Sequence, residues 1–400
     1  MRRARLKGNK NTMKNNKLMK NNKLKIGATW GAALALAFLG GAAGAQQTPG
    51  GSIGNGQDPS GRTDGGAASE GSFHGGADGL VYNTAIDDYN HKRYKEAASG
   101  LKDYLRNNPQ DAQAHRLMAD IDVAQNNIAA AVPEWEAAVR LDKNDKSSQV
   151  NLGVAYMQTG SYDKAVTLYQ TALAHSPKDP QLNMQFAVAL DNTGRHAEAA
   201  AAFEKAATFD PKNPVPVLYS GLLNHQTGHD DKAVPELKTA LALGTAEKFQ
   251  AYDALAEAAT AAKQNDEAIK YYALAGQAKP TDFITQYNLG VLEQNAGKKP
   301  EAEAAYRQAL TLKPSSAKAM AGVRSNLALL LLDQSKLDEA ATLLAQAAQD
   351  DPANAQYENN LGQVYEKQSK KDLAIAAYTK AVQLDPSLAG AKASLAQLQK

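Results

Sequence analysis

The sequence predicts an all-α fold, a solenoid built from nine helix-turn-helix units. Three spacings carry this prediction. Alanines recur in steps of 34 to 38 residues, a small residue precedes each alanine by twelve positions, and a bulky residue follows it by four. The alanine series is Ala97, Ala131, Ala165, Ala199, Ala233, Ala268, Ala302, Ala340 and Ala374. The small residues are Ala85, Ala119, Gly153, Ala187, Gly221, Ala256, Gly290, Ala328 and Gly362. The bulky residues are Leu101, Trp135, Tyr169, Phe203, Leu237, Tyr272, Tyr306, Leu344 and Tyr378.

Packing explains why these residue types recur at these spacings. Each unit is predicted to be a pair of antiparallel helices, neither of which can bury its apolar stripe alone. Small residues at the eighth and twentieth positions let the two helices approach closely, and the large residue at the twenty-fourth fills the remaining space. A proline twelve residues after the alanine ends the second helix in seven of the nine units.

The repeats resemble the tetratricopeptide repeat family, and residues 152–165, LGVAYMQTGSYDKA, lie close to the family consensus. The predicted units are 78–111, 112–145, 146–179, 180–213, 214–247, 249–282, 283–316, 321–354 and 355–388, followed by a capping helix over 389–400. The resemblance implies a right-handed α-solenoid, without catalytic residues or cofactor, that binds a protein or peptide in a concave groove lined by the first helices.

The N-terminal residues read as an export signal and a tether. Residues 1–25 contain ten Lys and Arg and no acid, Ile26 to Ala45 are uncharged, and Ala43-Gly44-Ala45 suits a signal peptidase. We therefore expect cleavage after Ala45 and an exported, periplasmic or secreted protein; an uncleaved inner-membrane anchor is the alternative. Residues 46–77 hold ten glycines and are expected to form a flexible linker.

Composition excludes several classes of function. The chain has no cysteine, so disulfides, thiol catalysis and iron–sulfur clusters are excluded. Without residues 1–25 it carries 34 basic against 42 acidic residues, which argues against nucleic-acid binding. His225 and His229 have a metal-ligand spacing, but Gly228 predicts a turn at this point, so no metal site is expected.

One carboxamide recurs on the groove face of the first helices. The sixth position is Asn or Gln in several units. We expect the binding groove to be lined by Asn151, Gln185, Asn288, Asn326 and Asn360. A carboxamide offers one donor and one acceptor group, which suits the backbone of a bound peptide. The alternative is that the asparagines support contacts between helices.

Neighbouring groove positions carry apolar side chains that could select a partner. The candidates are Met157, Met184, Leu218, Leu222, Tyr287 and Val291. Exposed in a concave surface, they would suit the hydrophobic face of a partner; turned inward, they would pack between adjacent units.

The sequence thus predicts a non-enzymatic scaffold for protein–protein interactions in the cell envelope. The alternative of a different class is a structural protein that assembles with copies of itself, and polymer export and glycan binding fit less well.

Overall fold

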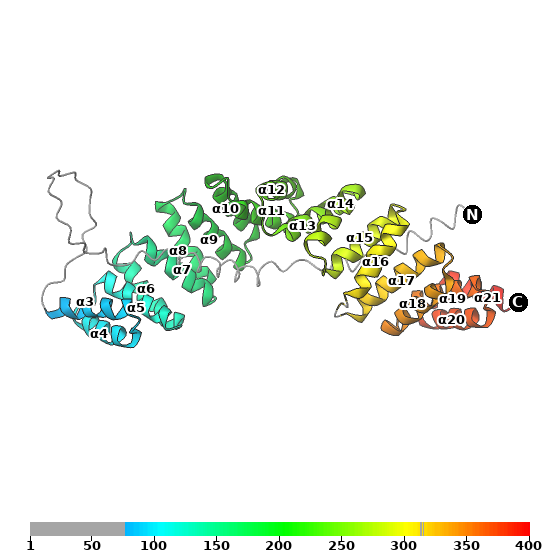
Figure 1. Ribbon diagram of the computed structural model, residues 1–400, viewed down its shortest axis with the longest axis horizontal. Helices are drawn as coiled ribbons and strands as arrows, with labels where there is room; N and C mark the ends of the chain where they lie inside the picture. The colour runs from blue at the N-terminus through cyan, green and yellow to red at the C-terminus, as the bar shows by residue number, and fades with distance from the viewer. Residues whose placement is uncertain (1–76, 313, 315) are drawn as a thin grey trace. The chain divides into compact units, whose positions relative to one another are not determined.

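The computed structural model describes residues 77–312, 314 and 316–400, which form nineteen helices and no strand. The predicted signal and the predicted linker up to residue 76 lie outside the described residues. The predicted all-α solenoid of helix pairs is confirmed, as Figure 1 shows for the succession of helices from α3 to α21. The chain divides into two compact bodies, and the division falls after Leu223, inside helix α11.

The N-terminal body holds four helix pairs and the start of a fifth. Its helices are α3 (Ala77–Asn90), α4 (Tyr94–Asn107), α5 (Ala112–Ala124), α6 (Ile128–Leu141), α7 (Lys146–Gln158), α8 (Tyr162–His175), α9 (Pro180–Asn192), α10 (His196–Phe209) and most of α11 (Pro214–Gln226). From α3 to α10, each helix packs against the next one along the chain.

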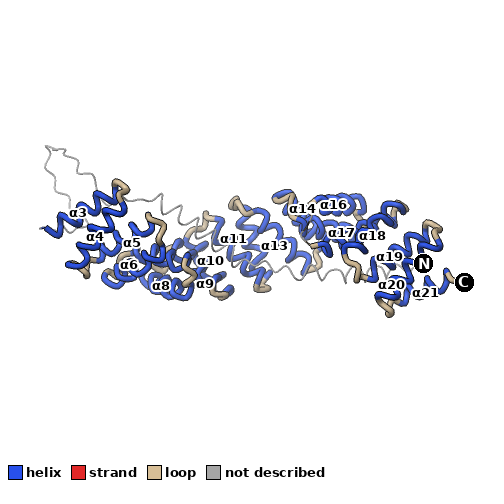
Figure 2. The backbone as a smooth tube through the Cα atoms, turned by 90° about the horizontal axis from the view of Figure 1, so that it is seen from below, coloured by secondary structure: helices blue, strands red, loops and turns tan. Residues whose placement is uncertain are grey.

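The C-terminal body continues the same pattern from Asn224 to Lys400. Its helices are α12 (Asp230–Ala242), α13 (Lys248–Ala261), α14 (Asn265–Ala278), α15 (Phe283–Asn295), α16 (Lys299–Thr311), α17 (Ala317–Asp333), α18 (Leu337–Asp350), α19 (Ala355–Lys367), α20 (Lys371–Leu384) and α21 (Ala389–Leu398). Short turns join the helices throughout (Figure 2). None of the described helices combines the length and apolarity that a membrane span requires.

Side-chain caps fix where many first helices begin. Asp111 accepts hydrogen bonds from two backbone N–H groups of α5, and Asp145, Asp179 and Asp282 cap α7, α9 and α15 in the same way. Because the first N–H groups of a helix have no partner inside it, these carboxylates satisfy donors that would otherwise be unpaired. The last residue of one unit thereby sets the start of the next.

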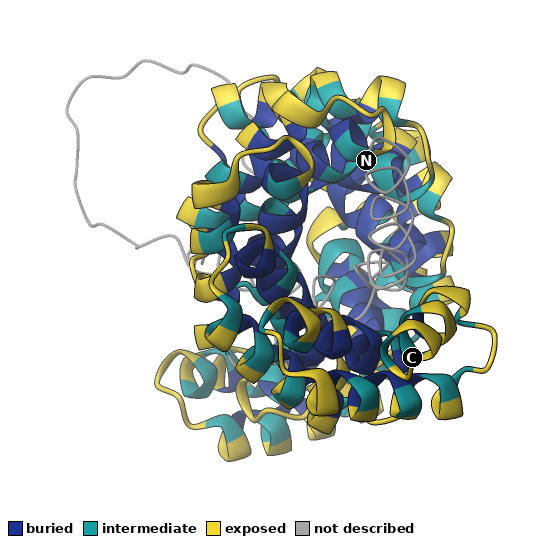
Figure 3. Ribbon diagram, turned by 90° about the vertical axis from the view of Figure 1, so that its right-hand side faces the viewer, coloured by how far each residue is buried: buried dark blue, intermediate teal, exposed yellow. Residues whose placement is uncertain are grey.

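The expected contact between small and large residues forms the core of each unit. A Cβ atom added to Gly153 would lie 2.3 Å from the Cζ of Tyr169, and one added to Gly290 would lie 2.7 Å from the Cδ1 of Tyr306. Both tyrosines are buried, and the repeating alanines are buried with them. Figure 3 shows this distribution, with buried residues where helices meet and exposed residues on the turns and free faces.

Two features interrupt or end the regular array. Residues 317–320, the four that exceed the repeat length, extend α17 to 17 residues. At the C-terminus, α21 packs against α20, and its buried Ala391 joins a cluster with Tyr378 and Ala381. Helix α21 therefore covers the apolar face that α20 would otherwise expose.

Candidate functional site

The candidate residues lie on a row of first helices. Helix α15 contacts α17, and α17 contacts α19, although a second helix separates each pair in sequence. The same holds for α3 and α5 in the N-terminal body. In units one and two and in units seven to nine, first helices of consecutive units therefore lie side by side, as a surface for binding an extended partner requires.

Two of the candidate asparagines contact tyrosines of other helices. The Nδ2 of Asn288 in α15 donates to the hydroxyl of Tyr272 in α14 at 3.2 Å, and the Nδ2 of Asn326 in α17 donates to the hydroxyl of Tyr287 in α15 at 3.2 Å. Asn288 is 3% exposed and Asn326 is 2% exposed. These bonds join neighbouring units, as the helix-contact interpretation requires, and they leave each carboxamide oxygen as an acceptor.

The other three carboxamides have different surroundings. Asn360 accepts a hydrogen bond of 2.7 Å from Gln356 of its own helix. Gln185 is buried, and its Oε1 has no hydrogen-bond partner among the described residues, while Asn151 is half-buried. The five residues thus share a place in the repeat but not a common bonding pattern. Their grip on a peptide backbone stays a prediction.

The six apolar groove candidates are buried, so the expectation that they are exposed in the concave surface is corrected. Met157, Met184, Leu218, Leu222, Tyr287 and Val291 are each less than a tenth exposed. Tyr287 and Val291 belong to a cluster that includes Leu327 and Leu361 of the two following units. Their burial follows from the close stacking of first helices, which turns these positions toward the adjacent unit. These side chains therefore agree with the alternative that they pack between adjacent units, and not with exposure to a partner.

An acidic cluster around His225 is the feature that the sequence analysis missed. The Nδ1 of His225 in α11 lies 2.6 Å from the Oδ1 of Asp230 in α12, and its Nε2 lies 3.1 Å from the Oε2 of Glu257 in α13. Asp253 lies one turn before Glu257 on the same helix. The cluster was detectable, because Asp253 and Glu257 occupy the fifth and ninth positions of unit six, which are groove positions in other units.

The protonation of this cluster is shifted by its surroundings. Burial raises the pKa of Asp253 to about 7, and the negative charges of Glu257 and Asp282 act in the same direction. Burial lowers the pKa of His225, but its hydrogen bonds to Glu257 and Asp230 outweigh this effect, and the net result is a raised pKa. The imidazole therefore favours its charged form between two carboxylates.

The side chains of His225 and His229, which are spaced like metal ligands, contact different groups and do not face a common point. His225 contacts the carboxylates described above, whereas the Nδ1 of His229 lies 3.0 Å from the hydroxyl of Thr227 in the turn before α12. Gly228 lies in that turn with a φ of +82°, a backbone conformation that favours glycine. In the described part of the chain, no group of three or more His, Asp or Glu side chains has an arrangement that could hold a metal ion.

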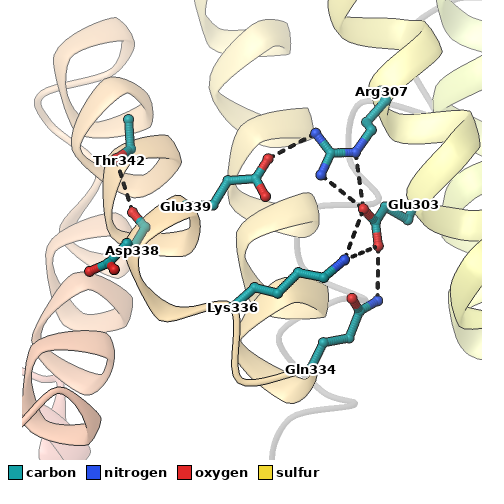
Figure 4. Close-up of polar contacts among 7 residues, drawn as sticks. All are labelled: Glu303, Arg307, Gln334, Lys336, Asp338, Glu339 and Thr342. Carbon is teal, nitrogen blue, oxygen red and sulfur yellow. Dashed lines mark hydrogen bonds and ion pairs between the residues drawn. The ribbon is translucent and has the colours of Figure 1, made fainter.

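The junction between units seven and eight is bridged by polar side chains (Figure 4). Glu303 in α16 accepts hydrogen bonds from Gln334 at 3.0 Å and from Lys336 at 3.2 Å, both in the turn between α17 and α18. Arg307 bonds to Glu303 in its own helix and pairs with Glu339 of α18 at 2.8 Å. These contacts tie the second helix of one unit to the next unit.

Comparison with known proteins identifies the repeat. Family models described as "Tetratricopeptide repeat" match residues 82–145, 116–180, 150–214, 285–316 and 325–389. Together these matches cover more than half of the chain. The chain therefore belongs to the tetratricopeptide repeat family.

Individual relatives are similar over short stretches. The chain is 35% identical over 77 residues to a β-barrel assembly-enhancing protease of Yersinia pestis, covering 19% of this chain and 16% of that protein. It is 29% identical over 97 residues to the photosystem I assembly protein Ycf3 of Prochlorococcus marinus, covering 23% of this chain and 56% of that protein. The chain thus spans about one sixth of the length of the first relative and just over half of the length of the second.

The chain is also similar to the solved structure of the C-terminal part of a TPR repeat-containing protein from Cytophaga hutchinsonii. Its sequence identity is 18% and its TM-score is 0.47, and the match covers 61% of this chain and 98% of that one.

Proposed function

We propose that the chain is an exported, non-enzymatic scaffold of the cell envelope, which binds extended or helical protein segments along its first helices. The observation that carries this proposal is the row of carboxamides on α15, α17 and α19, which are first helices in contact with one another. Asn288 and Asn326 use their Nδ2 groups within the array, and each retains an oxygen that can accept a bond from a peptide N–H.

The export part of the proposal is supported by the N-terminal sequence. A basic segment, an uncharged stretch from Ile26 to Ala45 and a small-x-small end follow one another in the order of a secretory signal. The mature protein would begin at Gln46.

The groove is tested by replacing Asn288, Asn326 and Asn360 with alanine together. Binding of the protein to an array of random-sequence peptides should weaken by a similar factor, about fivefold or more, for every peptide that binds, because the lost contacts are to backbone groups. Measurement of the helical signal by circular dichroism checks that the array remains folded.

Replacing Tyr272 and Tyr287 with phenylalanine is the matched control. This variant removes the two hydroxyls that Asn288 and Asn326 contact but keeps the carboxamides. If the asparagines act only between helices, the two variants lose stability alike and bind peptides like the wild type, which contradicts the proposed groove.

A further inference from the structure

A cavity of about 480 Å³ lies between α12, α13 and α14, where unit five meets unit six. Its lining includes the apolar residues Val234, Leu255, Ala259 and Tyr271, and of these Leu255, Ala259 and Tyr271 are largely covered by neighbouring side chains. Its rim is acidic, because Asp231 and Glu267 line it, and both residues are exposed. None of the carboxamides or apolar candidates of the groove lines this cavity.

At this junction, unit six lacks a glutamine side chain that units two, eight and nine carry. In units two, eight and nine the fourteenth position is glutamine, and each glutamine donates a hydrogen bond to the second helix of the preceding unit. The bonds run from Gln125 to the Tyr94 carbonyl oxygen, from Gln334 to Glu303 and from Gln368 to Asp338. The fourteenth position of unit six is Ala262, which has no side-chain donor and lines the cavity.

At two further repeat positions beside the cavity, units five and six carry a smaller or less polar residue than other units do. The twenty-first position is Glu303 in unit seven, where it receives the bridging bonds of Figure 4, but Val234 in unit five. The eleventh position is Leu190 in unit four and Leu331 in unit eight, both fully buried, but Ala259 in unit six. Small or apolar residues at all three positions leave the space between the helices unfilled.

The lining determines which partner fits. The apolar wall favours burial of one apolar side chain, and the volume admits a side chain as large as leucine or phenylalanine. Among the described residues, no lysine or arginine lines the cavity, while Asp230, Asp231 and Glu267 all do. The ammonium of Lys270 lies over the ring of Tyr271, which is one of the lining residues. Asp230 is engaged by His225, so the outward negative charge comes from Asp231 and Glu267. Such a rim attracts cationic groups on either side of the buried side chain.

We propose that this cavity is a second docking site, which binds a partner protein through one apolar side chain flanked by lysine or arginine residues. The site is separate from the proposed groove, so one scaffold holds two segments at once. Its specificity comes from two sources, because the volume of the cavity limits the size of the apolar side chain and the acidic rim favours positive flanking charge.

The test uses the labelled peptide Gly-Lys-Lys-Leu-Lys-Lys-Gly as the probe, with the full chain, in a fluorescence anisotropy titration. Peptides in which alanine replaces the leucine, or glutamate replaces the lysines, should bind at least about tenfold more weakly. Binding of the leucine peptide should weaken as salt is added, because the rim charges are exposed.

Two variants localise the binding to the cavity. Ala259→Leu places in unit six the residue that units four and eight already carry, and it should reduce binding about tenfold or more by filling the space. Glu267→Gln should reduce binding about two- to fivefold at low salt. The matched control is Glu301→Gln, which changes the corresponding exposed acid of unit seven and should leave binding unchanged.

The proposal is overturned if Ala259→Leu, folded by circular dichroism, binds the leucine peptide as tightly as the wild type. It is also overturned if the glutamate-flanked peptide binds equally well. Light scattering over a concentration series distinguishes a partner protein from a second copy of the chain. If the wild type self-associates and Ala259→Leu does not, the cavity binds a second copy, which overturns the proposed partner.

Discussion

A single imidazole joins three helices of the repeat array. His225 near the end of α11 contacts Asp230 at the start of α12 and Glu257 within α13. It therefore fixes the turn within unit five and also ties that turn to unit six. Asp253, Asp282 and Lys279 complete the charged surroundings of this histidine and its carboxylate partners. Because a histidine titrates near neutral pH, these contacts depend on pH.

We expect the stability of the protein to fall as pH rises above about 6.5, the ordinary pKa of a histidine. The folded-state pKa of His225 is raised above its ordinary value, so its contribution is complete below that ordinary value and is lost as pH rises through the folded-state pKa. Asp253 acts in the same direction at lower pH, because its pKa of about 7 in the folded chain disfavours the charged carboxylate.

Thermal unfolding of His225→Ala measures the effect. At about pH 6 the substitution should cost about 1.5–3 kcal/mol, the range for hydrogen bonds to charged groups, and the loss should shrink as pH rises. His229→Ala changes an exposed histidine in the neighbouring turn and should keep the pH dependence of the wild type. An unchanged pH profile in His225→Ala would show that other groups cause the dependence.

At the scale of the helix, close packing depends on glycines that face tyrosines. Gly290 lies against Tyr306 so closely that a methyl group at this position would overlap the ring. Gly100 in α4 differs, because an added Cβ there would lie 3.8 Å from the Cβ of Ala85, an ordinary contact. The two glycines lie inside helices but carry different constraints.

Replacing each glycine with alanine separates helix propensity from packing. Gly100→Ala should stabilise the protein by about 0.5–1 kcal/mol, because alanine favours the helix. Gly290→Ala should be net destabilising, by up to about 2 kcal/mol, because overpacking costs about 1–3 kcal/mol and exceeds the gain in propensity. Urea denaturation measures both, and equal stabilisation by the two substitutions would refute the packing argument.

The sequence was sufficient to predict the helix pairs but not the contacts between units. Gly153 and Tyr169 lie sixteen residues apart at fixed repeat positions, so their contact follows from the period alone. The direction of the Met184 and Leu222 side chains depends on how closely adjacent first helices stack, and the period does not specify this spacing. The contacts of His225 and the cavity beside Ala262 likewise need three helices from two units.

At the scale of the whole chain, charge is unevenly distributed. Residues 1–25 contribute ten positive charges, while the remainder carries 34 basic and 42 acidic residues. The full chain is therefore slightly basic and the proposed mature chain is acidic. An acidic scaffold is well suited to partners with basic segments, in agreement with the acidic rim of the cavity.

Export with cleavage after Ala45 predicts a protein that begins at Gln46. N-terminal sequencing of material from the periplasm or medium should give Gln46, Gln47 and Thr48 in that order. Isoelectric focusing should show a shift from a basic to an acidic species, because the removed segment contains cations and no acid. Membrane-bound protein that retains Ile26 to Ala45 would instead identify an uncleaved anchor.

The cavity between units five and six depends on repeat positions that can change without disturbing the helix pairs. The residues that open it, Val234, Ala259 and Ala262, occupy positions other than the small and bulky ones that hold each helix pair together. A substitution such as Ala262→Gln would supply the amide that bridges the junctions before units two, eight and nine. On the proposal made above, one or two substitutions at these positions open or close a docking site, while the small-to-large contacts that hold each helix pair together are kept.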